Sequence, residues 1–326
     1  LLKFSLKIMK FLVFIASLVC VLGYEVLSIY VEWGNPYDMG RLPVNDFTIT
    51  EMIDKSPLHT TAHYPNKSGE YPVVFFIGGM NGYVLSEMYT DVLRMVAAHG
   101  FIVFGVDYKY PALADGKYVF KHILKQDLEP YFNEIDFLKT FMVNRTPAKP
   151  VWNKLALMCH SSGCDCTLRM LRMNTTIFTS TVFVEPFSID AFDPVPDPVP
   201  ALMYGTQLAE EGLTKCCLPG TDFRQFYNIW KCPRLALEVA DFGHCDILNR
   251  EFWGVCTHIC TKSNETRLDE YHTFIQGAIS SFFISTLQGR QDAIMYLSDT
   301  TKIPVKLVEH QTDLNCTLEK KSNKFL

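Results

Sequence analysis

The sequence lacks an excess of basic residues: 30 lysines and arginines stand against 35 acidic residues, which gives a formal net charge of −5 over 326 residues. This balance offers no electrostatic attraction to a phosphate backbone, so we exclude a nucleic-acid-binding protein. Charged residues are also few, at 20% against 48% hydrophobic residues, which excludes a disordered chain. Internal repeats are absent as well. A single α/β domain of roughly 250 residues would bury a large core, so the length suits an enzyme.

Long hydrophobic runs are also missing. The run Phe11–Leu22 is shorter than the about 20 residues that a membrane-spanning helix needs, and we expect no stable membrane span. Three lysines precede this run and Val-Leu-Gly stands at its end, at residues 21–23, which is the pattern of a secretory signal peptide. We therefore expect a signal peptide over residues 1–23, with initiation at Met9. A buried first helix, or an anchor that extends towards Tyr30, is the alternative.

Cysteines and glycosylation sequons point to the same compartment. Eleven cysteines are typical of a disulfide-bonded protein from an oxidising environment, although their pairing cannot be deduced. Five N-x-[ST] sequons indicate surface loops of a glycoprotein. They lie at Asn66, Asn144, Asn174, Asn264 and Asn315. We expect a secreted or lumenal protein.

Short apolar runs alternate with amphipathic segments from residue 71 onward. The pattern predicts strands at residues 72–77, 101–106, 155–158, 181–184, 201–204 and 235–239, and helices at 84–99, 119–143, 164–173 and 268–287. This alternation predicts an α/β fold with a mostly parallel central sheet and helices on both faces. One domain is assigned to residues 24–298.

Three segments depart from this alternation. Residues 207–232 form a long insertion with several aromatic residues and cysteines, which indicates a lid, or else a surface excursion pinned by a disulfide. The proline-rich stretch Asp193–Pro200 follows a strand end, and we expect an extended loop near the ligand-binding edge of the sheet. Residues 299–326 are predicted to be a solvated C-terminal tail.

The candidate nucleophile is Ser161. It lies in Met158-Cys-His-Ser-Ser-Gly163, between an expected strand and an expected helix. A nucleophile elbow needs this context, because its serine occupies a strained strand-to-helix turn. Cys159 stands where the G-x-S-x-G pattern has glycine. The alternative is a serine that only begins a helix. His160 is excluded as the base, because a residue adjacent to the nucleophile points elsewhere.

A serine nucleophile needs a base that an acid holds in the correct tautomer. In this architecture the chain order is nucleophile, acid, histidine. His244 follows the strand expected at 235–239 and is the candidate base. Glu185 ends the strand expected at 181–184, where a buried carboxylate requires a partner, and is the candidate acid. Asp190 and Asp193 are the alternatives for the acid.

An oxyanion hole combines the backbone N–H after the nucleophile with one from the loop after an earlier strand. Ser162 and Met80 are the candidates, since Met80 follows Gly78-Gly79 and glycines let a ligand approach the backbone closely. The alternative is an ordinary glycine-rich turn. Because this chemistry uses protein groups alone, we expect no cofactor and no metal.

Several segments together resemble a known family. They are PVVFFIGGMNGY, MVAAHGFIVFGVDY, VFVEPF, and CCLPGTDFRQFYNIWKCP followed by DFGHCDILN. Between Tyr71 and Leu287 the chain resembles the chlorophyllase-like α/β hydrolases, which are close to esterases of the platelet-activating-factor acetylhydrolase type. The chain departs from the family pattern at Gly78, where histidine is usual, at Glu185, where aspartate is usual, and at Cys159 and Cys164, which replace glycines at the elbow.

The resemblance implies a serine carboxylesterase that acts on an ester with a long apolar moiety. Chlorophyll is the substrate for which the family is named. The expected partner is therefore a small apolar ester. Two alternatives stay open: a phospholipase or short-chain lipid esterase of the same fold, and a hydrolase-fold binding protein without catalysis.

Overall fold

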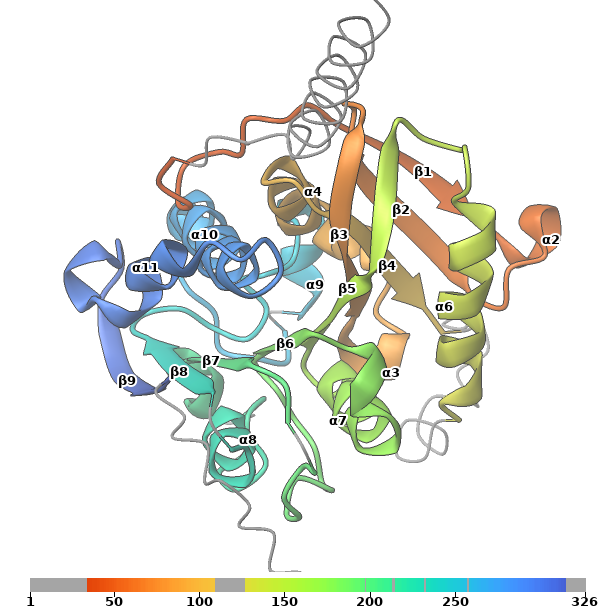
Figure 1. Ribbon diagram of the computed structural model, residues 1–326. Helices are drawn as coiled ribbons and strands as arrows, with labels where there is room; N and C mark the ends of the chain where they lie inside the picture. The colour runs from red at the N-terminus through yellow and green to blue at the C-terminus, as the bar shows by residue number, and fades with distance from the viewer. Residues whose placement is uncertain are drawn as a thin grey trace, which may run out of the picture. The chain divides into compact units, whose positions relative to one another are not determined.

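The computed structural model describes residues 34–108, 127–196, 198–212, 215–231, 233–256 and 258–314 (Figure 1). The expected signal peptide at 1–23, with its start at Met9, lies outside the described residues. The sequon at Asn315 and the last residues of the expected tail also lie outside them.

Nine strands of the described residues form one sheet, in the order β1-β2-β4-β3-β5-β6-β7-β8-β9. The pairings from β4 through β3 and β5 to β8 are parallel, whereas β1 with β2, β2 with β4, and β8 with β9 are antiparallel. The strands are β1 (Val44–Ile49), β2 (His59–Pro65), β3 (Gly69–Ile77), β4 (Ile102–Asp107), β5 (Ala148–His160), β6 (Ser180–Val184), β7 (Ala201–Thr206), β8 (Arg234–Val239) and β9 (Leu307–Asp313). A mostly parallel sheet surrounded by helices confirms the predicted fold class, the α/β-hydrolase fold.

Helices cover both faces of the sheet. The described helices are α2 (Glu51–Asp54), α3 (Gly79–Gly82), α4 (Thr90–Ala98), α6 (Glu129–Phe141), α7 (Gly163–Met173), α8 (Phe223–Ile229), α9 (Arg250–Cys256), α10 (Leu268–Thr286) and α11 (Met295–Ser298). Helices α4 and α10 pack on one face, and α6, α7 and α8 lie on the other (Figure 1). Among the described helices, none is both long enough and apolar enough to cross a membrane.

The central strands are continuous hydrophobic runs because both of their faces are covered. Every residue of β4, β6 and β7 is buried. On one face, Phe101 packs against Phe283 of α10. On the opposite face, Phe183 of β6 packs against Phe226 of α8. A strand that is buried on both faces has apolar residues at successive positions, whereas a half-exposed strand alternates apolar and polar residues. The continuous apolar runs in the sequence therefore predicted these strands correctly.

The outer strands escaped the sequence prediction. Strands β1, β2 and β9 mix polar and apolar residues, and most of β1 and β9 is partly or fully exposed. Residues 307–313 correct the expectation of a solvated tail, because they pair with β8 along its whole length. The reason is that an edge strand needs backbone hydrogen bonds more than hydrophobic side chains.

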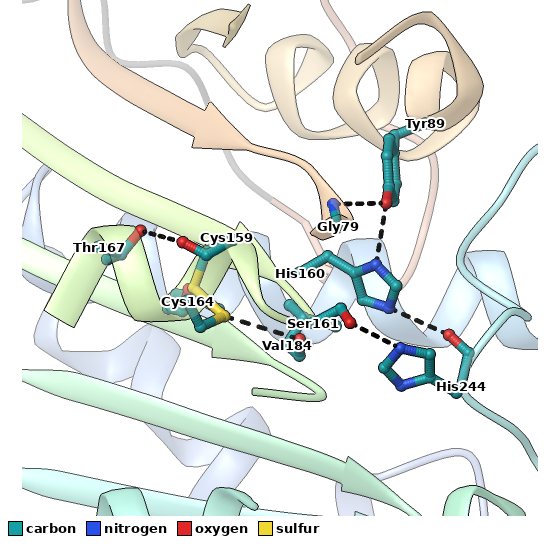
Figure 2. The surroundings of a disulfide bond; sticks show 11 residues. Gly79, Tyr89, Cys159, His160, Ser161, Cys164, Thr167, Val184 and His244 are labelled. Carbon is teal, nitrogen blue, oxygen red and sulfur yellow. Dashed lines mark hydrogen bonds between the residues drawn. A yellow bond between two sulfur atoms is a disulfide. The ribbon is translucent and has the colours of Figure 1, made fainter. Parts of the chain in front are cut away.

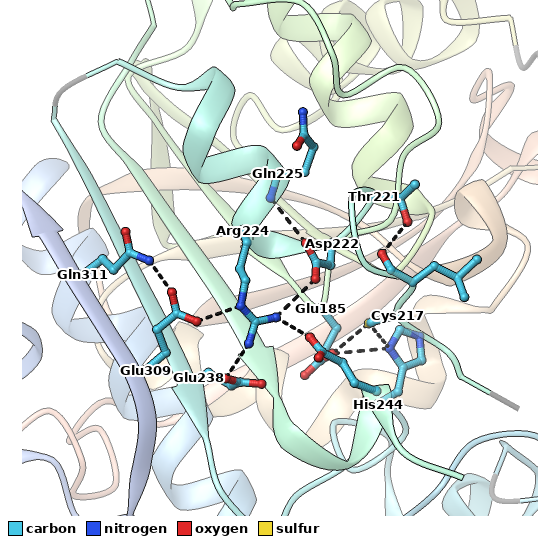
Figure 3. A network of polar contacts seen from close by, with 12 residues as sticks. Glu185, Cys217, Thr221, Asp222, Arg224, Gln225, Glu238, His244, Glu309 and Gln311 are labelled. Atoms are coloured by element: carbon cyan, nitrogen blue, oxygen red, sulfur yellow. Dashed lines mark hydrogen bonds and ion pairs between the residues drawn. The ribbon is translucent and has the colours of Figure 1, made fainter. Parts of the chain in front are cut away.

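An arginine links the last two strands of the sheet, β8 and β9. Arg224 of α8 binds Glu238 of β8 and Glu309 of β9, each at 2.7 Å (Figure 3). It lies in the insertion at 207–232, which the structure shows to be partly helical and joined to Cys260 through the Cys216–Cys260 disulfide.

Candidate active site

Ser161 occupies a sharp turn between β5 and α7. Its φ angle is 56°, in the left-handed region that side-chain-bearing residues rarely adopt. The turn is held on both sides, because Ser161 N donates to the Val184 carbonyl and Phe187 N donates to the Ser161 carbonyl, each at 3.1 Å. Such strain persists only where the surroundings over-determine it. The turn therefore has the form that a nucleophile elbow requires.

Gly163 is needed for the same turn. A Cβ at this position would lie 2.2 Å from the Gly78 carbonyl oxygen, a distance that no side chain tolerates. The first turn of α7 therefore approaches the loop after β3 closely. Gly78 is restricted in the same way, since its Cβ would lie 2.4 Å from the Val84 carbonyl oxygen.

The two cysteines that replace elbow glycines form a disulfide. Cys159 is the last but one residue of β5 and Cys164 the second residue of α7, and their Cα atoms are 5.1 Å apart. Figure 2 shows the bond beside Ser161. The disulfide therefore links the strand and the helix on either side of the turn.

His244 contacts the serine directly. Its Nε2 lies 3.0 Å from Ser161 Oγ (Figure 2), and the side chain comes from the loop after β8. Asp246 fixes this loop, because its buried carboxylate accepts from Gly243 N at 2.7 Å and from Trp253 Nε1 at 2.7 Å. The structure thus brings together the serine and the histidine that the sequence singled out.

Glu185 lies on the other side of the imidazole. Its Oε2 is 3.6 Å from His244 Nδ1, and the residue is 1% exposed. Like Ser161, it follows a parallel strand with a positive φ, 49°. Asp190 and Asp193, the alternative acids, are exposed, and Arg172 binds their backbone carbonyls. Of the three carboxylates, Glu185 is the one that the structure places beside His244.

A thiol that the sequence analysis assigned no role in the site lies beside both Glu185 and His244. Cys217 Sγ donates to Glu185 Oε2 at 3.1 Å and lies 3.5 Å from His244 Nδ1 (Figure 3). The thiol is free, although Cys216 beside it is disulfide-bonded. Burial, and then the charge of Glu185, raise the pKa of the Cys217 thiol, so it stays protonated. Glu185, Cys217 and His244 are also the described residues that could together hold a metal ion.

The predicted oxyanion donors, Met80 and Ser162, belong to the loop after β3 and to the turn of Ser161. Met80 belongs to the short helix α3 and has a φ of 52°, and Ser162 directly follows the nucleophile. Among the described residues, no acceptor engages the backbone N–H of Met80 or of Ser162. Both groups stay candidate oxyanion donors.

His160 connects the loop of His244 with the loop after β3. Its Nε2 lies 3.0 Å from the His244 carbonyl oxygen, and its Nδ1 lies 2.9 Å from Tyr89 Oη (Figure 2). A carbonyl only accepts, so Nε2 carries the proton and Nδ1 accepts from the tyrosine. Tyr89 Oη in turn accepts from Gly79 N at 3.0 Å. Burial, and then the neighbouring His244, lower the pKa of His160 well below its usual value, so the ring stays neutral.

Comparison with known proteins agrees with this architecture. Residues 33–313 match the family model described as Chlorophyllase. The chain is also 24% identical over 303 residues to Chlorophyllase-1 of Arabidopsis thaliana, a match that covers 83% of this chain and 90% of that protein. The chain therefore belongs to the chlorophyllase family.

Proposed function

We propose that the protein is a secreted serine carboxylesterase that hydrolyses an ester with a long apolar group. Family membership supports ester hydrolysis in general. The observation that carries the serine mechanism is the 3.0 Å contact between Ser161 Oγ and His244 Nε2 at a strained strand-to-helix turn.

In the proposed reaction, Ser161 Oγ attacks the ester carbonyl while His244 Nε2 takes its proton. The backbone N–H groups of Met80 and Ser162 stabilise the negative oxygen of the tetrahedral intermediate. His244 then protonates the leaving alcohol, and the charge of Glu185 stabilises the imidazolium in the interval. A water molecule releases the acid from Ser161 by the same steps in reverse.

Replacement of the nucleophile tests this mechanism. Hydrolysis of p-nitrophenyl esters by Ser161→Ala should fall by about 10⁴-fold or more, because the residual rate comes from binding and the oxyanion donors alone. Ser298→Ala, which alters an exposed serine in α11, is the matched control. Equal turnover by Ser161→Ala and the parent protein would sink the proposal.

The acid is tested by a second pair of variants. Glu185→Gln should lower kcat by up to about 10⁴-fold, because the neutral amide cannot stabilise the imidazolium. Asp190→Asn should change kcat little, since that carboxylate is exposed. A larger loss in Asp190→Asn would show that Glu185 is not the acid.

Exposed apolar side chains on two loops near Glu185 support a long apolar substrate. Ile189 is 45% exposed, Phe192 63% and Leu218 47%. The first two follow β6 and the third adjoins Cys217, and Ser188 N joins their loops by donating to the Thr221 carbonyl at 3.2 Å. Hydrophobic residues exposed together on neighbouring loops are typical of a site that binds apolar ligands.

The substrate class is decided by comparing turnover of chlorophyll, a platelet-activating-factor analogue and a triglyceride. We expect chlorophyll to be preferred. Preference for either lipid would favour the phospholipase or short-chain esterase alternative. Failure of Ser161 to react with a fluorophosphonate probe would instead favour a binding protein without catalysis.

A further inference from the structure

Three potential metal ligands meet beside the nucleophile. Glu185 follows β6, Cys217 lies in the insertion at 207–232, and His244 lies in the loop after β8. The separations are 3.1 Å for Sγ to Oε2, 3.5 Å for Sγ to Nδ1, and 3.6 Å for Nδ1 to Oε2. With metal–ligand bonds of about 2.0 to 2.3 Å, neighbouring ligands of a tetrahedral zinc ion lie about 3.3 to 3.7 Å apart. Two of the three separations fall within this range and the third, from Sγ to Oε2, is slightly shorter, so the three atoms form approximately one face of such a tetrahedron.

A second observation points to an absent ligand at this place. Glu185 Oε1 is buried and has no hydrogen-bond partner among the described residues. A buried carboxylate oxygen without a partner is costly. Because a carboxylate can bind a cation through one or both oxygens, a cation at this position would also satisfy Oε1.

We propose that Glu185, Cys217 and His244 bind a thiophilic divalent cation, of the chemical class of Zn²⁺ and Cd²⁺, and that the bound cation inhibits the esterase. The ligand set selects the cation. A thiolate with an imidazole suits these ions, whereas Mg²⁺ and Ca²⁺ prefer oxygen ligands throughout. The inhibition rests on the proposed function, whereas the binding does not.

The protons and charges of this step balance. The Cys217 thiol loses its proton to solvent as the sulfur–metal bond forms, and Glu185 binds as the carboxylate. The two anionic ligands neutralise the two positive charges of the ion, so the buried site has no net charge. His244 Nδ1 gives its proton to solvent and binds the ion through the lone pair that this leaves. Nε2 takes up a proton from solvent, so the imidazole stays neutral.

This change of tautomer accounts for the inhibition. Nε2 faces Ser161 Oγ at 3.0 Å. With a proton on Nε2 and the metal on Nδ1, the imidazole has no lone pair left to accept the serine proton. The cation also occupies Glu185, which would otherwise stabilise the imidazolium.

Metal binding is tested with Co²⁺ on the chelator-treated, glycosylated full-length protein. We expect one equivalent to bind, with the near-ultraviolet charge-transfer band of a thiolate–Co²⁺ bond. The band should be absent in Cys217→Ser and in Cys217→Ala. It should persist in Cys166→Ser, which removes the other buried cysteine of the described residues that forms no disulfide. Near-ultraviolet circular dichroism establishes that each variant is folded. Absence of the band from the parent protein, or its persistence in folded Cys217 variants, would overturn the proposal.

Inhibition is tested by titrating Zn²⁺ into the p-nitrophenyl ester assay. Each variant is compared with its own metal-free rate. The parent protein should lose at least about tenfold in rate and recover it on chelation, and Cys217→Ser should need roughly 10- to 100-fold more Zn²⁺ for half-inhibition. The Co²⁺ band in Ser161→Ala separates the two proposals, because that variant keeps all three ligands. A band without any esterase activity in the parent protein would contradict the proposed function alone. Esterase activity without a band would contradict the metal site alone.

Discussion

At the scale of single residues, Tyr89 and His160 illustrate how a site depends on groups that never touch the substrate. The tyrosine hydroxyl accepts from Gly79, which precedes the proposed oxyanion donor Met80, and donates to His160. His160 in turn binds the backbone of His244. One chain of hydrogen bonds therefore connects the loop of the proposed oxyanion donor with the loop of the proposed base.

Tyr89→Phe is expected to lower kcat about tenfold. The change leaves Gly79 N–H and His160 Nδ1 without their partner. It thereby removes the link between the Gly79 loop and the His244 loop. KM should change much less, since no contact with the substrate is removed. Steady-state kinetics on p-nitrophenyl esters measure both. Tyr71→Phe is the matched control, because its hydroxyl binds the Lys67 carbonyl away from the site. An equal fall in kcat for the two variants would contradict a positioning role for Tyr89.

Asp107 should make the stability of the fold depend on pH. Burial raises the pKa of its carboxyl from 3.8 to about 8, although Ser86 donates to it through both N and Oγ. The folded protein therefore binds a proton that the unfolded chain has lost. The stabilisation is fully present below the unfolded pKa and is lost as pH rises through the folded pKa.

The free energy of unfolding should accordingly fall between about pH 4 and about pH 8, and it should fall less in Asp107→Asn, which resembles the protonated acid at every pH. Urea denaturation of both proteins across this range measures the difference. Parallel pH dependences would show that Asp107 does not contribute.

Sequence reasoning found those site residues that directly follow a strand in the chain. Ser161, Glu185 and His244 each follow a strand, so local patterns made them candidates, with Asp190 and Asp193 left open for the acid, and the structure places the three together. Tyr89 and Cys217 gave no such signal. Their roles depend on contacts between segments far apart in the chain, across 71 residues for Tyr89 and His160 and 32 for Cys217 and Glu185.

At the scale of secondary-structure elements, the two described disulfide pairs act on different parts of the molecule. Cys159–Cys164 closes a loop of a few residues around the elbow, whereas Cys216–Cys260 spans 44 positions and joins the insertion to the segment before α10. Loop-closure entropy grows with the length of the loop. The two bonds should therefore contribute differently to stability and to activity.

Removing each bond by a pair of Cys→Ala changes tests this expectation. Loss of Cys216–Cys260 should lower the free energy of unfolding by about 4 kcal/mol, and loss of Cys159–Cys164 by about 2 kcal/mol. The elbow pair should have the larger effect on kcat, since it flanks Ser161. Denaturation and ester kinetics on the same samples measure both. The reverse order in both measurements would contradict this assignment.

The sheet was predictable where strands are buried on both faces and unpredictable at its edges. Continuous apolar sequence identified the central strands, and β6 was predicted to within one residue of its observed bounds, Ser180–Val184. At the edges, β9 reads LVEHQTD, which resembles a solvated segment. Its place is fixed by backbone pairing with β8 and by Arg224, neither of which a hydropathy pattern records.

At the scale of the whole molecule, the surface is consistent with the proposed secretion. Four of the predicted sequon asparagines lie among the described residues, at Asn66, Asn144, Asn174 and Asn264, and all four are exposed between elements of secondary structure. N-glycosylation requires such accessible loops. The disulfides fit the same oxidising compartment.

Expression of the whole chain in cells with a secretory pathway should therefore yield protein in the medium whose mass falls on treatment with peptide N-glycosidase F. Replacing the four asparagines with glutamine should remove most of this mass shift. Electrophoresis with and without the glycosidase measures it. Retention of an unglycosylated, fully reduced protein in the cytosol would contradict the proposal.

The backbone around Ser161 also holds the main chain of the proposed acid. Ser161 is hydrogen-bonded through its N–H to Val184 and through its carbonyl to Phe187, the residues on either side of Glu185 and Pro186. The main chain of the proposed acid is therefore anchored to that of the nucleophile without any help from the carboxylate. A change in the length of the acidic side chain would therefore leave this backbone anchor undisturbed, because neither hydrogen bond involves the carboxylate.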